Sequence, residues 1–168
     1  DITMEATSIA ENIVNFDNPS VIDVQEISLT NNAPEFFPLG ETVVTWTATD
    51  IAGNTASTEQ KIILIDRISP ILQLPEDIVV EATSSDQNEI NLEDVTATDN
   101  IEVISVTNDA PDTFPLGETV VTWTATDSSG NSATAAQTIS VVDTTAPSIT
   151  APDGIELEAT SSGSTVDT

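Results

Sequence analysis

The chain repeats itself, and the length of the repeat limits the folds that it can adopt. The segment FPLGETVVTWTATD at 37–50 recurs letter for letter at 114–127, which is 77 residues later. That period is longer than the roughly 20 to 50 residues of a helical or leucine-rich solenoid unit. It is long enough for one small β domain per repeat, so we expect a row of separate small domains.

A shorter match places the boundaries of the repeats. The tetrapeptide EATS occurs three times, at Glu5, Glu81 and Glu158. The second copy contains one additional residue, near Asn100. The predicted organisation is repeat one at 1–76, repeat two at 77–153, and the opening strand of a third, incomplete repeat at 154–168. The restart at 154 indicates that the array continues.

The segments between repeats are short and contain proline. Asp66–Pro70 follows repeat one's last predicted strand, and Asp143–Pro147 occupies the same position in repeat two. Because proline restricts the backbone and no flexible Gly/Ser linker is present, neighbouring repeats should be held at a restricted angle. The expected partners are therefore neighbouring repeats and other copies of the same chain.

Apolar residues alternate with a period of two, which is typical of half-buried strands. We predict a hairpin of strands 42–50 and 58–66, with the DxxGN segment as its turn, and further strands at 78–83, 93–98 and 103–108. Six or seven short strands per repeat predict an all-β sandwich with minimal helix. The predicted core residues are Val44, Trp46, Ala48, Ile62 and Leu64, and in repeat two Val121, Trp123, Ala125, Ile139 and Val141.

The composition excludes several classes of function. The chain has 29 Asp and Glu against 2 Lys and Arg, a formal net charge of −27, and no His or Cys. Such a charge is repelled by nucleic acids and anionic lipid, and no apolar run is long enough to insert into a membrane. Without His or Cys there is no catalytic triad, zinc–thiolate site or disulfide. We predict that the chain is not an enzyme and that only carboxylate chemistry with hard cations remains.

Several motifs together carry a family resemblance. They are DxxxP, EATS, ATDN at 97–100, FPLGET, TATDxxGN and a closing acidic residue after the last strand. This pattern resembles the HYR (hyalin repeat) domain family over nearly the whole chain. The resemblance implies tandem immunoglobulin-like β-sandwich domains in extracellular or cell-surface proteins, with adhesive or structural roles and no catalytic activity.

The chain departs from the family pattern at one pair of positions. Many members carry two cysteines where this chain has Leu74 with Thr58, and Ala151 with Ala135. No cross-link can form there. Domains of about 77 residues bury only roughly 60 to 65% of their surface, so we expect stabilisation from neighbouring repeats or bound ions.

Acidic residues at the repeat ends are the candidate metal ligands. In an immunoglobulin-like sandwich, Asp99 and Asp127 would lie in loops at the end where the first strand enters, next to Asp66 of the preceding repeat. Ca²⁺ takes six to eight oxygen ligands, and we predict a tentative calcium site there. Asn131 and Glu81 are weaker candidate ligands at the same site. The equivalent acidic residues are Asp23 and Asp50 for the site ahead of repeat one, and Asp143 for the site after repeat two.

Two alternatives stay open for these residues and for the function. Aspartate in a DxxGN segment also stabilises turns by itself, and Glu81 also fits a solvated strand face. The chain is predicted to be a structural module, such as an adhesin stalk, a surface-layer (S-layer) subunit or a filament. The alternative is a calcium-dependent module that binds a glycan or a protein.

Overall fold

The computed structural model describes residues 1–154, and within them every regular element is a β-strand. The strands are β1 (Ile2–Glu5), β2 (Ile27–Asn31), β3 (Gly40–Asp50), β4 (Thr55–Ile65), β5 (Ile71–Gln73), β6 (Ile78–Glu81), β7 (Thr96–Thr98), β8 (Val103–Asn108), β9 (Gly117–Asp127) and β10 (Ser132–Val142). The predicted all-β fold class is confirmed. The predicted opening strand at 154–168 lies, after Gly154, outside the described residues.

Each repeat contains a four-stranded sheet of the same topology. The strand order is β1-β4-β3-β2 in repeat one and β6-β10-β9-β8 in repeat two. β3 with β4, and β9 with β10, form the two long antiparallel hairpins. The first strand of each sheet runs parallel to its last strand. The chain therefore enters the sheet at one end of these strands and leaves it at the other end.

A second layer covers the large sheet and makes the immunoglobulin-like sandwich. In repeat two it includes a two-stranded antiparallel sheet of β5 and β7. The strand predicted at 93–98 is shorter than expected, because its partner β5 is only three residues long and pairs with Thr96–Thr98 alone. Residues 93–95 therefore have no strand to pair with among the described residues.

The core of each repeat lies between these layers. Nine of the ten predicted core residues are buried, with Trp46 and Trp123 at 4% and 5% exposure. The exception is Ala48, which is half-buried, whereas its counterpart Ala125 is fully buried. Both alanines follow the same local sequence, so the difference comes from what packs against the repeat from outside.

The DxxGN turns form as predicted and explain why glycine is needed there. The backbone N–H of Asp50 bonds to the carbonyl of Asn54 at 3.0 Å, and Gly53 takes a φ of +90°. Asp127, Gly130 and Asn131 repeat this geometry. A left-handed φ is costly for residues with a Cβ, so the turn tip requires glycine.

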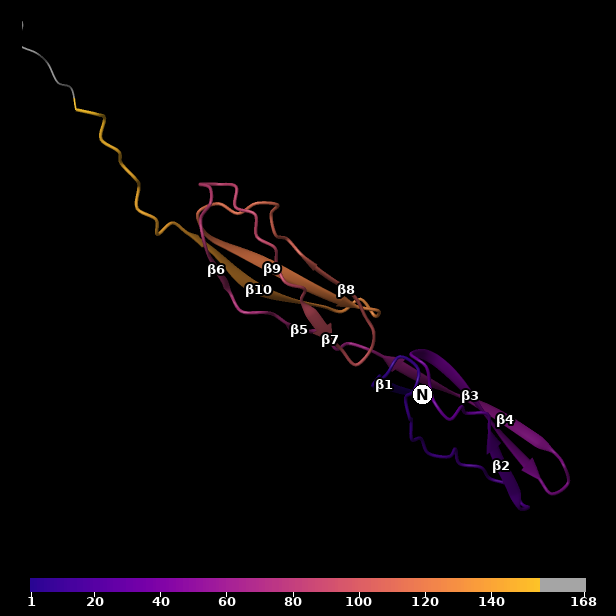
Figure 1. Cartoon of the computed structure of the whole chain (residues 1–168). Coiled ribbons are helices and arrows are strands. Elements are labelled where there is room, and N and C mark those ends of the chain that lie inside the picture. Colours follow the sequence, from indigo (N-terminus) through magenta and orange to yellow (C-terminus); the bar gives the residue numbers. More distant parts are fainter. Residues whose placement is uncertain (155–168) are drawn as a thin grey trace, which may run out of the picture.

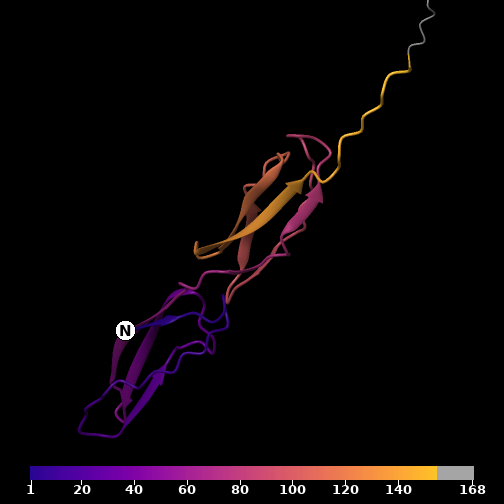
Figure 2. The same cartoon turned by 90° about the vertical axis from the view of Figure 1, so that its left-hand side faces the viewer.

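The two repeats lie end to end along one axis, as both views show (Figure 1, Figure 2). The β9–β10 turn of repeat two points toward repeat one, and the β3–β4 turn lies at the opposite end of the molecule. The domain boundaries at 76/77 and 153/154 stay predictions. None of the described residues belongs to a helix that could cross a membrane.

Candidate metal centre

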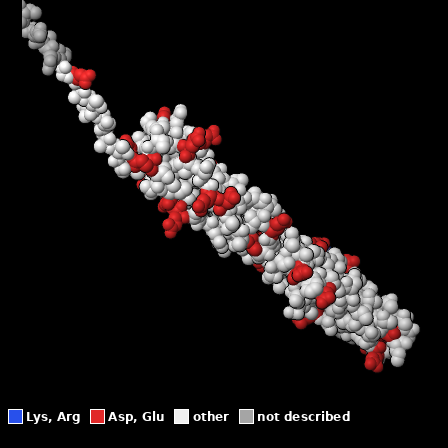
Figure 3. Space-filling view, in the orientation of Figure 1, with Lys and Arg blue, Asp and Glu red and all other residues white. Residues whose placement is uncertain are grey.

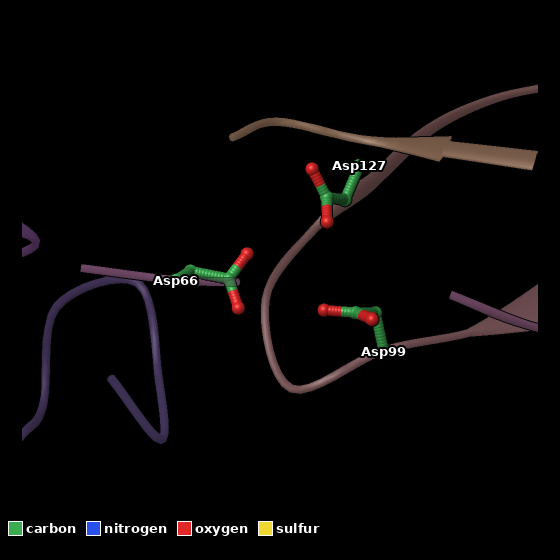
Figure 4. A group of neighbouring side chains, drawn as sticks. All are labelled: Asp66, Asp99 and Asp127. Atoms are coloured by element: carbon green, nitrogen blue, oxygen red, sulfur yellow. The ribbon is translucent and has the colours of Figure 1, made fainter. Parts of the chain in front are cut away.

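Three aspartates from three loops meet where repeat one joins repeat two. Asp66 follows β4, Asp99 follows β7, and Asp127 ends β9. One carboxylate oxygen of each residue lies within 4.8 Å of those of the other two (Figure 4). The structure brings these three predicted residues together, while their role as metal ligands stays a prediction.

The local sequence holds each aspartate in place. One carboxylate oxygen of Asp66, Asp99 and Asp127 accepts a hydrogen bond from the backbone N–H two residues later, at 3.2, 3.1 and 2.8 Å respectively. This arrangement is the aspartate turn that the alternative interpretation predicts. It leaves oxygen lone pairs free to face the joint, so a turn role and a ligand role are compatible.

Two asparagines of repeat two bind the carboxylate of Asp66. The side-chain amide of Asn100 donates to the Ala6 carbonyl at 2.9 Å and to Asp66 Oδ1 at 3.0 Å. The amide of Asn131 donates to Asp66 Oδ2 and to Asp127 Oδ2, both at 2.9 Å. Asp66 is thus held by both loops of the next repeat.

Asn100 is the site residue that the sequence reasoning did not select. It lies near the additional residue of repeat two, which the strand register places at the bulge between Val103 and Ser105. An insertion in one copy of an otherwise regular repeat was the signal that could have drawn attention to this part of the chain.

The three carboxylates are poorly exposed and carry like charges. Asp127 is 0% exposed and Asp66 is 9% exposed. At separations within 4.8 Å, each pair of charges repels by roughly 3 to 4 kcal/mol at an effective dielectric constant of about 20. Among residues 1–154, the ion pair that forms joins Lys61 to Glu41, two exposed side chains outside this group. A bound cation would offset the repulsion.

Two buried oxygens at the joint lack hydrogen-bond partners, and one of them belongs to the Asp99 carboxylate. Asp99 Oδ2 and Asn100 Oδ1 are buried and accept no hydrogen bond from any described residue. A buried acceptor left unpaired costs about 1 to 3 kcal/mol. The joint therefore holds one unpaired oxygen within the group of three carboxylates and one on the Asn100 amide, and a cation would satisfy them.

Burial and hydrogen bonds have opposite effects on the pKa of Asp66. Burial raises the pKa of this carboxyl group, but the hydrogen bonds from the Asn100 amide and the Ile68 N–H outweigh that effect. The pKa of Asp66 is therefore below its ordinary value of 3.8. The folded joint holds Asp66 ionised, as a cation ligand must be.

Glu81 and Asp143 lie at the far end of repeat two. Glu81 accepts hydrogen bonds from the Thr144 N–H at 2.9 Å, the Thr144 hydroxyl at 2.7 Å and the Thr145 hydroxyl at 2.9 Å. The Thr144 hydroxyl contributes most to lowering the pKa of Glu81. Asp143 accepts from the Thr145 N–H at 3.1 Å. Glu81 therefore binds the segment that leaves repeat two by hydrogen bonds, and it lies away from the three aspartates.

Asp23 and Asp50 lie at the opposite end of the molecule. Both line one hollow at the outer end of repeat one, together with Asn54. Asp23 Oδ1 accepts from the Gln25 N–H at 2.8 Å, and the Asn54 side chain donates to Asp50 Oδ2 at 2.7 Å and lowers the pKa of Asp50. These residues repeat the positions of Asp99 and Asp127 without a preceding aspartate in the described residues.

Comparison with known proteins gives consistent matches. The sequence model of the family described as HYR domain matches at residues 3–63 and 65–141. Hyalin of Strongylocentrotus purpuratus is 42% identical over 136 residues, covering 75% of this chain and 11% of that protein. Hyalin of Lytechinus variegatus is 35% identical over 154 residues, covering 83% of this chain and 29% of that protein. The chain therefore spans less than a third of either hyalin.

A solved structure was also compared with the chain. The protocadherin GammaB4 extracellular domain aligns with 79% of this chain and 26% of that one, at 17% identity and a TM-score of 0.33.

Proposed function

This chain belongs to the HYR domain family, and from that premise we propose that it is a non-enzymatic structural module of an extracellular or cell-surface protein. Its tandem repeats act as a spacer, as in an adhesin stalk, a surface layer or a filament. Calcium at the joint between repeats makes the spacer stiff. The similarity to two hyalins over most of the chain supports a role as a repeat module.

The shape and the joint support the spacer role. The two sheets lie in line (Figure 1), and Asp66 of repeat one is bonded to Asn100 and Asn131 of repeat two. Carboxylates are spread along the length of the visible face (Figure 3). Like charges along a rod resist its folding back on itself, so both features favour an extended array.

One observation carries the calcium proposal: three carboxylates converge at the joint, and one oxygen of Asp99 and the side-chain oxygen of Asn100 are buried there without a hydrogen-bond partner. Two ligands on opposite sides of a Ca²⁺ ion are about 4.6 to 5.2 Å apart, since each lies about 2.3 to 2.6 Å from the ion. The three carboxylate oxygens lie within 4.8 Å of one another, which is close enough for one ion to contact all three. Asp66, Asp99 and Asp127 would supply carboxylate ligands, and Asn100 Oδ1 an amide ligand.

The donor set selects for a hard cation. All candidate ligands are oxygens, and the chain contains no His or Cys to favour zinc or copper. Modules of extracellular proteins typically bind Ca²⁺ with dissociation constants of roughly 10⁻⁴ to 10⁻³ M. Binding to the folded state alone would add about 2.7 kcal/mol at 100 times the dissociation constant. For repeats of this size, the melting temperature would rise by roughly 10 °C.

Thermal melting in chelator and in millimolar calcium, at constant ionic strength and low protein concentration, tests the proposal. Wild type should gain stability in calcium, and Asp99→Asn with Asp127→Asn should remove the gain. The matched control is Asp23→Asn with Asp50→Asn, which makes the same changes in the equivalent loops of repeat one. Equal calcium responses in all three proteins would indicate general charge screening and contradict the site.

A further inference from the structure

Repeat one carries three exposed apolar side chains on two neighbouring segments. They are Ile9, Ile13 and Phe36, with exposed fractions of 48%, 70% and 42%. Backbone hydrogen bonds join the two segments, among them the bond from the Leu39 N–H to the Ile9 carbonyl at 3.1 Å. We call these three side chains the apolar patch.

Strand pairing holds Ile13 and Phe36 side by side. Asn12 and Phe37 form an antiparallel bridge, and both are buried. Because successive side chains of an extended segment point to opposite faces, the next pair along, Ile13 and Phe36, points outward. The bridge rests on the core, where the ring of Phe37 packs edge-on against Phe16 at a centroid distance of 6.0 Å. The apolar patch therefore has a fixed base.

Repeat two has the same framework without the patch. Its bridge joins Asn88 to Phe114, and the Leu116 N–H bonds to the Ser85 carbonyl at 3.1 Å. The patch positions are occupied there by Ser85, Glu89 and Thr113. Since repeat two forms the same bridge with these polar side chains, the fold does not require apolar ones. Packing within the repeat therefore does not explain the patch.

The patch is exposed although it lies at the end of repeat one that meets repeat two. Gly40 follows Leu39 directly and pairs with Leu64, two residues before Asp66. Repeat two is in place on that side, and its contacts leave all three patch residues exposed. The patch is therefore open in the joined repeats.

Acidic residues flank the patch. Glu11 and Glu35 are exposed and lie on the same two segments. A second copy of the chain would bring the same carboxylates, and a formal charge of −27, to the contact and would be repelled. A cationic partner would be attracted. Charge complementarity therefore favours an apolar segment that also carries lysine or arginine.

We propose that the apolar patch binds a segment of a partner protein in which apolar side chains lie between lysine or arginine residues. The apolar side chains would contact Ile13 and Phe36, and the cationic groups would pair with Glu11 and Glu35. Exposed apolar patches rimmed by polar residues mark interaction sites. A standard interface takes roughly 20 to 30 residues from each side, so three side chains suit a weak contact. Such binding needs no calcium and adds adhesion to the spacer role.

Two short synthetic peptides separate apolar recognition from charge attraction. One alternates leucine with lysine, and the other has serine in place of leucine and carries the same charge. In chelator at constant ionic strength, the chain should bind the leucine peptide roughly tenfold more tightly. The amide NMR signals that shift should belong to residues 9–13 and 35–39. Equal affinity for the two peptides would overturn the proposal.

Side chains taken from repeat two provide a loss variant that the same framework is known to carry. Ile9→Ser, Ile13→Glu and Phe36→Thr, made together, should remove the preference for the leucine peptide. Because both peptides have the same charge, the added carboxylate affects them alike. A preference that survives in the loss variant would overturn the proposal.

The reverse exchange provides a gain variant. Ser85→Ile, Glu89→Ile and Thr113→Phe, added to the loss variant, should restore the preference and move the shifted NMR signals to repeat two. A preference that does not return in the gain variant would contradict recognition by these three side chains.

Sedimentation in chelator tests a second copy as the occupant. Wild type and the loss variant should sediment alike. Association of wild type that the loss variant lacks would identify another copy as the occupant and overturn the proposal. All of these measurements are made without calcium, so their failure leaves the melting response to calcium unaffected.

Discussion

Asn100 and Asp66 join the two repeats through a direct hydrogen bond of 3.0 Å between the amide nitrogen and Oδ1. The same amide also binds the Ala6 carbonyl at 2.9 Å. One side chain therefore contacts the backbone and the closing acid of the preceding repeat. The strand register makes Val24 the equivalent residue of repeat one, and because valine has no side-chain amide it cannot make this contact.

Replacing Asn100 should weaken the joint. Asn100→Ala removes two hydrogen bonds to repeat one, one of them to a carboxylate, and should cost about 1 to 3 kcal/mol of unfolding free energy. Urea denaturation followed by tryptophan fluorescence measures this loss. Asn15→Ala, at an exposed asparagine, is the control and should change stability by less than about 0.5 kcal/mol. Equal effects of the two variants would contradict the role of Asn100.

The stability of the joint should fall in acid because of Asp66. Its pKa in the folded chain lies below the ordinary value of 3.8, so the unfolded chain takes up the proton first as pH falls. The stabilisation is present above pH 3.8 and is lost as pH falls from there through the folded pKa. Urea unfolding as a function of pH, in chelator, measures it. Asp66→Asn should flatten this acid limb, whereas Asp143→Asn, at the exposed counterpart, should preserve it.

Replacing Gln137 should lower the free energy of unfolding more than replacing its counterpart Gln60. Gln137 is 1% exposed, accepts from Trp123 Nε1 at 3.3 Å and donates to the Glu76 carbonyl at 2.9 Å. Gln137→Met keeps the volume but leaves the buried Trp123 N–H and the Glu76 carbonyl without a partner, which should cost about 1 to 3 kcal/mol. Gln60→Met is the matched control and should cost less, because Gln60 is half-buried. Urea denaturation of both variants measures the two losses of unfolding free energy. Equal losses would contradict the greater role of Gln137.

Gly130 should be required for its backbone conformation alone. Its φ is +89°, and a Cβ added there would meet nothing within 4 Å. Gly130→Ala should therefore cost about 1 to 2 kcal/mol through strain. Gly154→Ala also places its Cβ in open space, at a glycine without that conformation, and should leave the melting temperature unchanged. If Gly130→Ala left the melting temperature unchanged, the prediction would be wrong, because the turn could then change its backbone conformation without a cost in stability.

Local patterns predicted much of the fold. Alternation in 42–50 predicted β3 and the inward direction of Trp46, and the DxxGN segment predicted its turn, because both depend on neighbours close in sequence. The sequence also indicated that Asp66, Asp99 and Asp127 belong to repeat ends. It did not indicate that β1 runs parallel to β4, or that Asn100 bonds to Asp66, because those contacts join residues far apart in the chain.

The identical segments at 37–50 and 114–127 separate what the sequence by itself determined from what tertiary structure decided. Both form the same eleven-residue strand with the same glycine at its start, because strand formation follows from local alternation and turn chemistry. Yet Ala48 is half-buried and Ala125 is fully buried. Burial depends on what packs against a surface, and within residues 1–154 it is repeat two that receives β5 and the contacts of another repeat. The sequence therefore determined the strands and their repetition, and tertiary contacts decided which acids meet and how deeply each strand is buried.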